Sequence, residues 1–289
     1  MKIKTITKKY INQKVYNLGV EKEQNRNYFA NNILVHNCYT NATVNGHHAD
    51  YWHIRQALEN MSQMKVFEVA FGKGEPTKHP KFAQILQDAR YFNIVPNFTT
   101  RSLHWLTNDD MREEILEYAG AFAYSLGTAK AITRLNELAE KYRINKDRIN
   151  IHVVMGTINQ KSFSDIINTA DDHDLRVTLL GYKNTGRGTE FKPIHHDWWL
   201  EVLMNRRYHV NVSIDTTLAA QYEKQIQQAN VPVYTYHTQE GKFSAYWDIV
   251  DDYVAPDSYT NDPNLQHKTY LGNYDEDSFE KFLEAYQTF

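Results

Sequence analysis

The distribution of apolar residues divides the chain into two regions with different periodicities. In the first region, apolar and polar side chains alternate over residues 2–7 and 14–20, and short apolar runs follow at residues 28–30 and 33–35. Alternation with a period of two predicts β-strands. Strands this short cannot enclose a core alone, so we expect residues 1–37 to be a small all-β piece that needs a complementary partner.

From residue 38 onward, helical and strand patterns alternate. Strands are expected at residues 66–71, 94–100, 121–126, 149–155, 176–180 and 209–214. Helices are expected at residues 50–64, 81–91, 109–119, 130–143, 162–173, 195–206 and 217–229. This order predicts an α/β fold with a parallel sheet covered by helices, either open or curled into a partial (β/α) barrel. In such folds, ligands bind just beyond the carboxyl ends of the strands.

The C-terminal region carries shorter elements. Strands are expected at residues 231–237 and 241–249, a turn at residues 256–259, and a final amphipathic helix at residues 278–286. We interpret residues 231–289 as a cap over the carboxyl edge of the sheet that contributes to substrate choice.

Composition narrows the class of protein. Apolar residues make up 42% of the 289, enough for an ordinary core. A mean hydropathy of -0.64 and the lack of a long apolar run argue against a membrane span. The first residues have no apolar signal-peptide core. We therefore expect a soluble cytoplasmic protein with no membrane partner.

The net charge of -3 hides an uneven distribution. Residues 1–37 hold seven Lys or Arg and two acidic residues, whereas the remainder holds 25 basic and 33 acidic residues. Such asymmetry indicates a segment with its own partner, and a solvated basic arm is the plainer alternative. No continuous basic cluster with interleaved aromatic residues is present, so a nucleic-acid partner is not expected.

Cys38 is the only cysteine in the chain, and it directly follows His36 and Asn37. An Asn before a lone nucleophile suggests chemistry on the chain's own backbone. Two stretches, Val-Tyr-Asn-Leu at 15–18 and Asn-Tyr-Phe-Ala-Asn-Asn-Ile-Leu-Val-His-Asn-Cys at 27–38, resemble the C-terminal fragment of a split intein of the Hint type. The chain begins at Met1, as a separately translated fragment would.

This resemblance implies autocatalytic cleavage and protein trans-splicing. The Asn37 side-chain amide would attack its own backbone carbonyl, form a succinimide and break the bond between residues 37 and 38. His36 would hydrogen-bond that carbonyl or protonate the leaving amine. The Cys38 thiolate would first take over the upstream chain as a thioester, which an S-to-N shift then converts into a peptide bond. The family's first nucleophile and its Thr-x-x-His block are absent, which implies an N-terminal intein fragment as partner.

One position departs from the intein pattern. The family usually has His just before the Asn-Tyr/Phe-Phe-Ala-Asn run, where this chain has Arg26. A guanidinium can stabilise an oxyanion but is a poor proton shuttle, so the role of Arg26 stays open.

A second resemblance lies beyond the strand expected at residues 66–71. The run Gly72-Lys73-Gly74-Glu75-Pro76 resembles the GGEP motif of radical S-adenosylmethionine (radical SAM) enzymes, with Lys73 in place of the first Gly of the quartet. In that family the motif binds the methionyl amino group, a contact that suits a carboxylate and a turned backbone. The expected cofactor-binding residues are Gly72, Gly74, Glu75, Pro76, Thr100, Ser125 and Tyr182.

The radical SAM family also uses a CxxxCxxC loop whose three thiolates hold a [4Fe–4S] cluster. This chain has one Cys, and Cys38 stands where the third cysteine should fall. The first strand and the first two cysteines are then expected on another polypeptide. A split intein that interrupts the gene just before the third cysteine explains both absences. Cys38 would be a splicing nucleophile first and a metal ligand afterwards.

The leading hypothesis divides the chain into three parts. Residues 1–37 are a split-intein fragment, residues 38–230 are a radical SAM partial barrel without its first strand, and residues 231–289 are the cap. Splicing would join Cys38 onward to an N-terminal radical SAM portion, and the product would use S-adenosylmethionine and the cluster for radical chemistry on an unknown substrate.

Three alternatives stay open. In the first alternative, the chain is part of a cis-splicing radical SAM protein whose upstream part is missing from the sequence. In the second, it is a non-enzymatic α/β binding module with a basic arm. Cys38 itself is alternatively a small buried hydrophobe. The pairs at residues 47–48 and 195–196 are more typical of exposed histidines than of metal ligands.

Overall fold

The computed structural model describes the chain except for residues 1–4, 12, 20–27, 31–32, 36–46, 186–187, 190–191, 206–211, 233–234, 237, 239–243, 273–279, 281–283 and 285–289. Contacts divide the chain into two compact units, Met1–Cys38 and Tyr39–Phe289. Among the described residues, no helix is long and apolar enough to cross a membrane.

The first unit contains two antiparallel strand pairs. β1 (Thr5–Ile11) pairs with β2 (Gln13–Gly19), and β3 (Tyr28–Ala30) pairs with β4 (Ile33–Val35). Three strands lie where the apolar pattern predicts them. β1 runs to Ile11 instead of ending near residue 7, because pairing with β2 continues after the alternation stops. The expected splicing residues His36, Asn37 and Cys38 lie outside the described residues.

The second unit is built on a six-stranded parallel sheet. Its strands are β5 (Glu68–Phe71), β6 (Val95–Thr100), β7 (Phe122–Ser125), β8 (Ile149–Val154), β9 (Arg176–Leu180) and β10 (Val212–Ile214). They lie side by side in chain order, and every neighbouring pair is parallel. Because crossovers between parallel strands are right-handed, a sequential order places all connecting helices on one face. The α/β prediction is confirmed.

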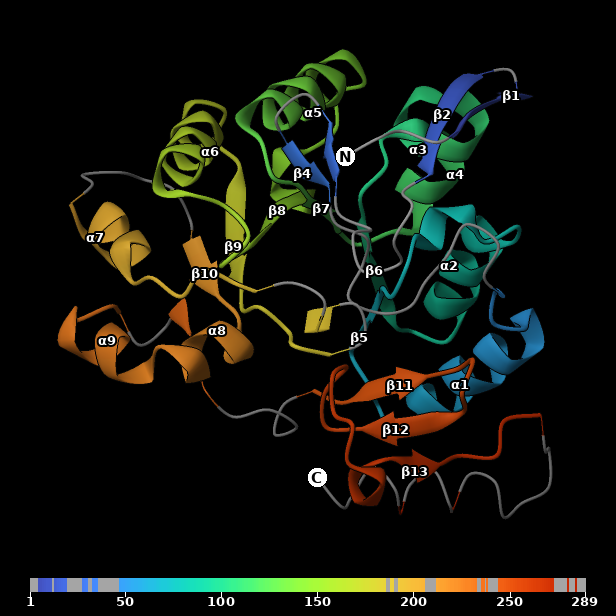
Figure 1. Ribbon diagram of the computed structural model, residues 1–289. Helices are drawn as coiled ribbons and strands as arrows, with labels where there is room; N and C mark the ends of the chain where they lie inside the picture. Colours follow the sequence, from blue (N-terminus) through green and yellow to red (C-terminus); the bar gives the residue numbers. More distant parts are fainter. Residues whose placement is uncertain are drawn as a thin grey trace. The chain divides into compact units, whose positions relative to one another are not determined.

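Helices precede, connect and follow these strands and lie around the outside of the sheet (Figure 1). They are α1 (Tyr51–Gln63), α2 (Phe82–Tyr91), α3 (His104–Thr107), α4 (Asp109–Tyr118), α5 (Ala129–Lys141), α6 (Gln160–Asp172), α7 (Trp198–Met204), α8 (Thr216–Gln221) and α9 (Glu223–Gln228). The single helix expected at residues 217–229 is interrupted at Tyr222. This side chain is buried against Trp199, with ring centroids 5.6 Å apart, and packing overrides helical propensity there.

The core lies between the sheet and its helices. In β8, Ile149, Ile151 and Val153 are fully buried, whereas Asn150 and His152 point to the opposite face. Parallel sheets are usually apolar on both faces. Polar side chains on the face away from the helices therefore suggest that this face serves a ligand instead of the core.

A small antiparallel sheet forms the C-terminal region (Figure 1). β11 (Tyr246–Asp248) pairs with β12 (Tyr253–Ala255), which pairs with β13 (His267–Lys268). The pattern predicts only the first of these. The prediction of a strand at residues 231–237 is wrong for residues 231, 232, 235 and 236, which are the described ones and form no strand. Pro232 has no backbone N–H to donate to a neighbouring strand, and its carbonyl accepts a turn hydrogen bond from Thr235 N at 3.0 Å. Of the final helix expected at residues 278–286, Glu280 and Glu284 are described, and both are helical.

A glycine at the end of β9 allows close packing of α8, which yields a stability prediction. A Cβ atom on Gly181 would lie 2.6 Å from Leu218 N and 2.7 Å from Thr217 Cγ2. We expect Gly181→Ala to lower the free energy of unfolding by roughly 2 kcal/mol in urea titrations, because α8 must shift. Gly127→Ala is the matched control, since no described atom lies within 4 Å of its Cβ. Equal stability of the two variants would contradict this account.

Candidate site at the carboxyl edge of the sheet

The expected motif forms a sharp turn directly after β5. Lys73 and Gly74 have positive φ angles of 58° and 99°, in the left-handed region. The turn leads into the short 3-10 helix η2 (Pro76–Lys78), where Pro76 occupies a first-turn position. Proline fits there because its missing N–H would have no helical partner. The turn thus places Glu75 at the carboxyl edge of the sheet.

Three donors fix the Glu75 carboxylate. The hydroxyls of Thr77 and Thr100 donate to Oε1 at 2.7 and 2.8 Å, and the backbone N–H of Arg101 donates to Oε2 at 2.9 Å. Thr77 and Thr100 are both buried, and the Thr100 hydroxyl also lies 3.0 Å from Ser102 O and accepts from Ser102 N at 3.0 Å. An ionised carboxylate offers about four acceptor positions, so Oε2 retains capacity for one further donor. The geometry therefore suits a cationic ligand group.

The negative charge of Glu75 affects the pKa values of two neighbouring side chains, Tyr124 and His104. Burial raises the pKa of Tyr124, and the nearby Glu75 carboxylate raises it further. Burial lowers the pKa of His104, whose Nδ1 lies 2.9 Å from Ser102 Oγ. Both side chains therefore stay neutral near pH 7, and the charged groups that act on them are Glu75, Arg101 and Lys78.

The other expected cofactor residues lie at the same edge on different strands. Ser125 ends β7 and pairs in register with His152 of β8. Tyr182 follows β9, and its hydroxyl donates to Gly188 O at 2.5 Å. One hydrogen bond joins Thr100 to Glu75, whereas Ser125 and Tyr182 lie one and three strands further along. Gly72 and Gly74 belong to the turn itself.

His152 is a candidate that the sequence did not single out. It lies on the polar face of β8, between Ser125 of β7 and Thr178 of β9 in the strand register. Burial lowers its pKa to about 4, and the Lys183 ammonium adds to this effect. Its signal in the sequence is weak, since Asn150 and His152 alternate with apolar residues in a strand otherwise typical of a core.

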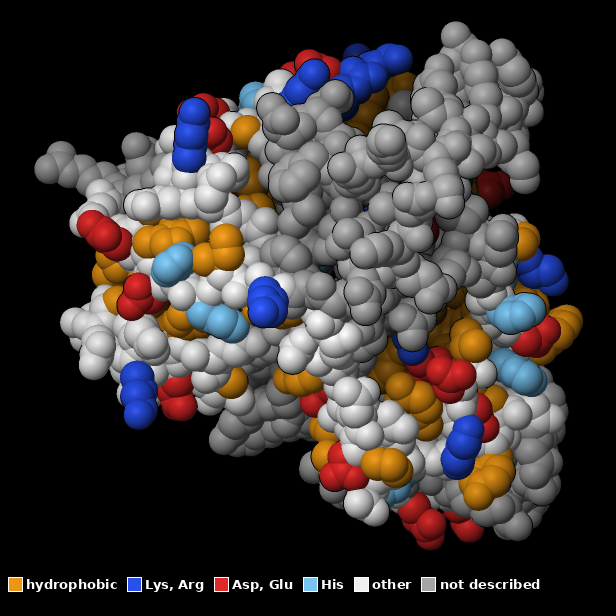
Figure 2. Space-filling model, viewed as in Figure 1, with side chains coloured by type: hydrophobic (Ala, Val, Ile, Leu, Met, Phe, Trp, Pro, Cys, Tyr) orange, Lys and Arg blue, Asp and Glu red, His pale blue; other side chains and the backbone are white. Residues whose placement is uncertain are grey.

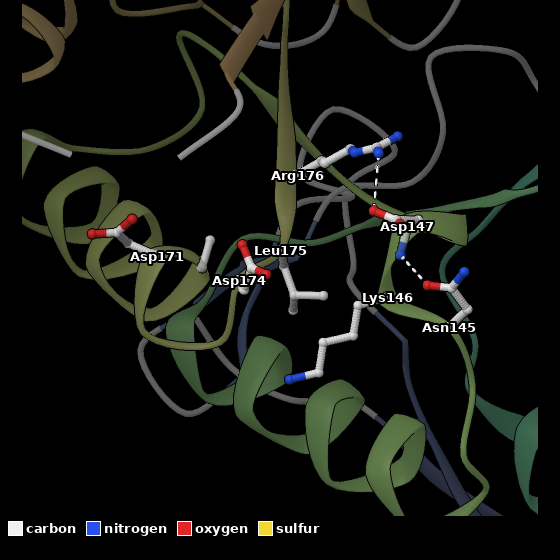
Figure 3. Close-up of a pocket in the computed structure, with 8 residues that line it drawn as sticks. Asn145, Lys146, Asp147, Asp171, Asp174, Leu175 and Arg176 are labelled. Carbon is white, nitrogen blue, oxygen red and sulfur yellow. Dashed lines mark hydrogen bonds and ion pairs between the residues drawn. The ribbon is translucent and has the colours of Figure 1, made fainter. Parts of the chain in front are cut away.

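Two hollows lie near opposite edges of the sheet. One, of about 150 Å³, is lined by Lys146, Asp147, Asp174 and Arg176 among others, in segments that precede β8 and β9 (Figure 3). It lies at the amino edge, away from Glu75. The other, of about 450 Å³, is lined by Tyr182, Asn184, Lys192, His195 and Gln221 among others. It lies at the carboxyl edge, where parallel sheets bind ligands, so we assign the site to this edge.

The C-terminal region contacts the carboxyl edge at two lysines. Lys73 forms an ion pair with Asp248 of β11. Lys183 donates to Ser258 Oγ at 3.3 Å, and its ammonium lies 4.8 Å from the centroid of the Tyr259 ring. Both lysines belong to loops that follow strands of the parallel sheet, so the C-terminal region lies against the candidate site.

The described surface shows no extended field of one sign on the face that Figure 2 presents. Lys and Arg side chains there are interspersed with acidic and neutral ones. Within the described part of the chain, no three His, Cys, Asp or Glu residues are grouped to hold a metal ion. His47, His48, His195 and His196 are exposed, as expected. Cys38, the expected metal ligand, lies outside the described residues.

Comparisons with known proteins find similar folds among solved structures but no match by sequence. No protein-family model and no curated protein sequence matches the chain. Structures of SuiB from Streptococcus suis, a radical SAM enzyme, are similar in fold. SuiB bound to S-adenosylmethionine matches with a TM-score of 0.56 and 14% identity over 80% of this chain and 60% of that one.

A second SuiB structure, bound to the precursor peptide SuiA, matches with a TM-score of 0.53 and 15% identity. It covers 65% of this chain and 47% of that one. The chain therefore spans less than two thirds of either SuiB chain. At these identities the similarity concerns the fold, and the α/β fold with its six-stranded parallel sheet resembles that of radical SAM enzymes.

The low pKa of His152 predicts acid sensitivity. Since the folded state disfavours the protonated ring, the unfolded chain takes up this proton first as the pH falls from about 6.5 to 4. Stability is therefore lost across that window, by up to roughly 3 kcal/mol for this group. We expect His152→Gln to reduce the pH dependence in urea titrations between pH 7 and 4. His47→Gln, at an exposed position, should retain it, and an unchanged slope in His152→Gln would refute the prediction.

Proposed function

We propose that residues 39–289 form the S-adenosylmethionine-binding part of a radical SAM enzyme, with Glu75 as the contact for the methionyl amino group. The observation that carries this proposal is the fixed Glu75 carboxylate, which three donors hold at the carboxyl edge with one acceptor position unused. The SuiB fold supports the same interpretation. Thr100, Ser125 and Tyr182 are the proposed polar contacts along the same edge.

The residues present do not fit a [4Fe–4S] cluster by themselves. Such a cluster needs three thiolates in this family, and the chain offers Cys38 alone. We propose that Cys38 supplies one ligand and that residues from another polypeptide supply the other two. The chain would then have no radical activity until it is joined to that partner.

We also propose that the joining is protein trans-splicing. Support comes from the intein-like stretch that ends in His36, Asn37 and Cys38. The end of the first compact unit at Cys38 is consistent with a separable N-terminal element. In this proposal Asn37 cyclises, His36 assists the cleavage, and residues 1–37 are released. An N-terminal intein fragment carrying the N-terminal enzyme portion is the required partner.

For the substrate, we propose a peptide. SuiB has been captured with a precursor peptide, which supports this class by analogy of fold. Polar side chains on the face of the sheet away from the helices suit peptide groups. Asn150 donates to Thr178 at 2.8 Å, and Thr178 and Ser213 share a hydrogen bond of 2.7 Å.

Binding of S-adenosylmethionine tests the Glu75 assignment. Glu75→Gln keeps the shape but removes the charge that attracts an ammonium group, so we expect the Kd to rise by roughly tenfold. Equilibrium dialysis with labelled S-adenosylmethionine measures this on the full chain. Glu113→Gln, at an exposed position of α4, is the control. An affinity that is equal in both variants and the wild type would exclude Glu75 as the contact.

Splicing is tested by mixing the chain with an N-terminal fragment of a related split intein. Asn37→Ala lacks the amide that forms the succinimide, so residues 1–37 should stay attached to the rest of the chain. Electrophoresis and intact-mass measurement detect whether they are released. Cys38→Ala should abolish ligation, because no thiolate is left to accept the upstream chain. Asn261→Ala, at an exposed position outside the intein-like stretch, is the control for removing an amide. Normal ligation by Asn37→Ala would rule out the splicing proposal.

A further inference from the structure

An unusual residue joins the motif loop to the C-terminal sheet. Lys73 stands where the radical SAM motif has Gly, and its ammonium pairs with the carboxylate of Asp248 in β11. The Asp248 side chain is 2% exposed, whereas that of Lys73 is 34% exposed. Exposed ion pairs contribute little to stability, but a buried carboxylate depends strongly on its partner. Because the Asp248 carboxylate is buried, we expect it to depend strongly on the Lys73 ammonium.

Asp248 is surrounded by donors from its own sheet. The Tyr246 hydroxyl donates to Oδ2 at 2.9 Å, and the backbone N–H groups of Val250 and Asp251 each donate to Oδ1 at 3.1 Å. Burial alone would raise the pKa of Asp248, but the hydrogen bond from Lys73 and the one from the Asp251 backbone outweigh it and lower the pKa. Asp248 is therefore held as an anion, and Lys73 is its cationic partner from the parallel-sheet side.

The backbone at Lys73 makes this pairing costly to maintain. Its φ of 58° is in the left-handed region, where Gly would be favoured and a Lys side chain is disfavoured. The pairing with Asp248 gives a physical reason for Lys at this position. It also fixes the loop two residues before Glu75.

Hydrogen bonds within the C-terminal sheet join the segments around Asp248 to one another. Trp247 Nε1 donates to Thr269 Oγ1 at 3.1 Å, and the Thr269 hydroxyl donates to Asp252 at 2.5 Å. These bonds connect β11, the turn before β12 and the residue that follows β13. A second attachment joins the region to α1, where Gly272 N donates to Gln56 Oε1 at 2.8 Å. Moving Asp248 therefore requires the sheet to move with it.

We propose that Asp248 is a positioning residue for the cofactor loop, and that the Lys73–Asp248 pair couples the β11–β13 sheet to residues 72–76. This inference rests on the proposed binding of S-adenosylmethionine at Glu75. Coupling is reciprocal, so docking of the sheet favours the binding-competent loop, and a ligand on the loop favours docking of the sheet. The C-terminal sheet thereby becomes part of the cofactor site without touching Glu75.

The first test needs no ligand. Hydrogen exchange of the full chain is followed by mass spectrometry in Asp248→Asn, with Lys78→Gln as control from the same loop. We expect amides of residues 72–78 and of residues 246–255 to exchange about tenfold faster in Asp248→Asn and unchanged in the control. Lys73→Gly is the second variant, since it removes the ion pair while relaxing the backbone, and it should speed exchange at residues 246–255. Unchanged exchange at residues 72–78 in Asp248→Asn would overturn the inference.

The second test adds S-adenosylmethionine in millimolar excess. In the wild type it should protect both segments, and in Asp248→Asn only residues 72–78. Lys73→Arg retains the charge and should keep protection of both segments, whereas Lys73→Gly removes the ion pair and should lose protection of residues 246–255. Protection of both segments in Asp248→Asn contradicts the coupling. Protection of neither in the wild type contradicts the proposed cofactor site instead, and the ligand-free exchange then decides the coupling alone.

Discussion

The sequential order of the six parallel strands is the constraint on which the rest of the second unit depends. Because right-handed crossovers then place every connecting helix on one face, the apolar side chains of the strands need to face only that side. Phe98 and Phe122 stack there at 5.7 Å, and Trp105 packs against Phe122 at 4.9 Å. The opposite face does not pack into the core, and it carries Asn97, Asn150, His152 and Thr178 at register positions between the buried ones.

The same order explains how the site is assembled. Each strand ends at one edge, so short loops from different strands meet there without long insertions. The Glu75 turn follows β5, while Thr100 ends β6, the neighbouring strand, and Arg101 follows it. One carboxylate thus ties two adjacent loops together, and its charge is available at the edge because its donors are neutral groups. The position of such a site therefore depends on the strand order of the sheet, and its binding chemistry depends on the side chains of the loops.

The sequence predicts the parts of this fold that depend on local pattern. Alternation and flanking turns locate β6, β8 and β9 to within about one residue, and the motif after β5 locates Glu75. The three-stranded C-terminal sheet is mostly missed, because strands of two or three residues are defined by pairing rather than by periodicity. Asp248 cannot be linked to Lys73 from the sequence, since 175 positions separate them. His152 is hidden by the apolar residues on either side of it.

Under the proposed function, the two roles of Cys38 impose an order of events. Both splicing and metal ligation use the thiolate, and a thiolate bound to iron is not free to attack a thioester. One sulfur cannot serve both at once, so ligation has to precede cluster assembly. This order is also the only one that brings the missing thiolates to Cys38, because they reach it through the peptide bond that splicing makes. Under this proposal, a single cysteine in the chain by itself agrees with a cluster that assembles only after ligation.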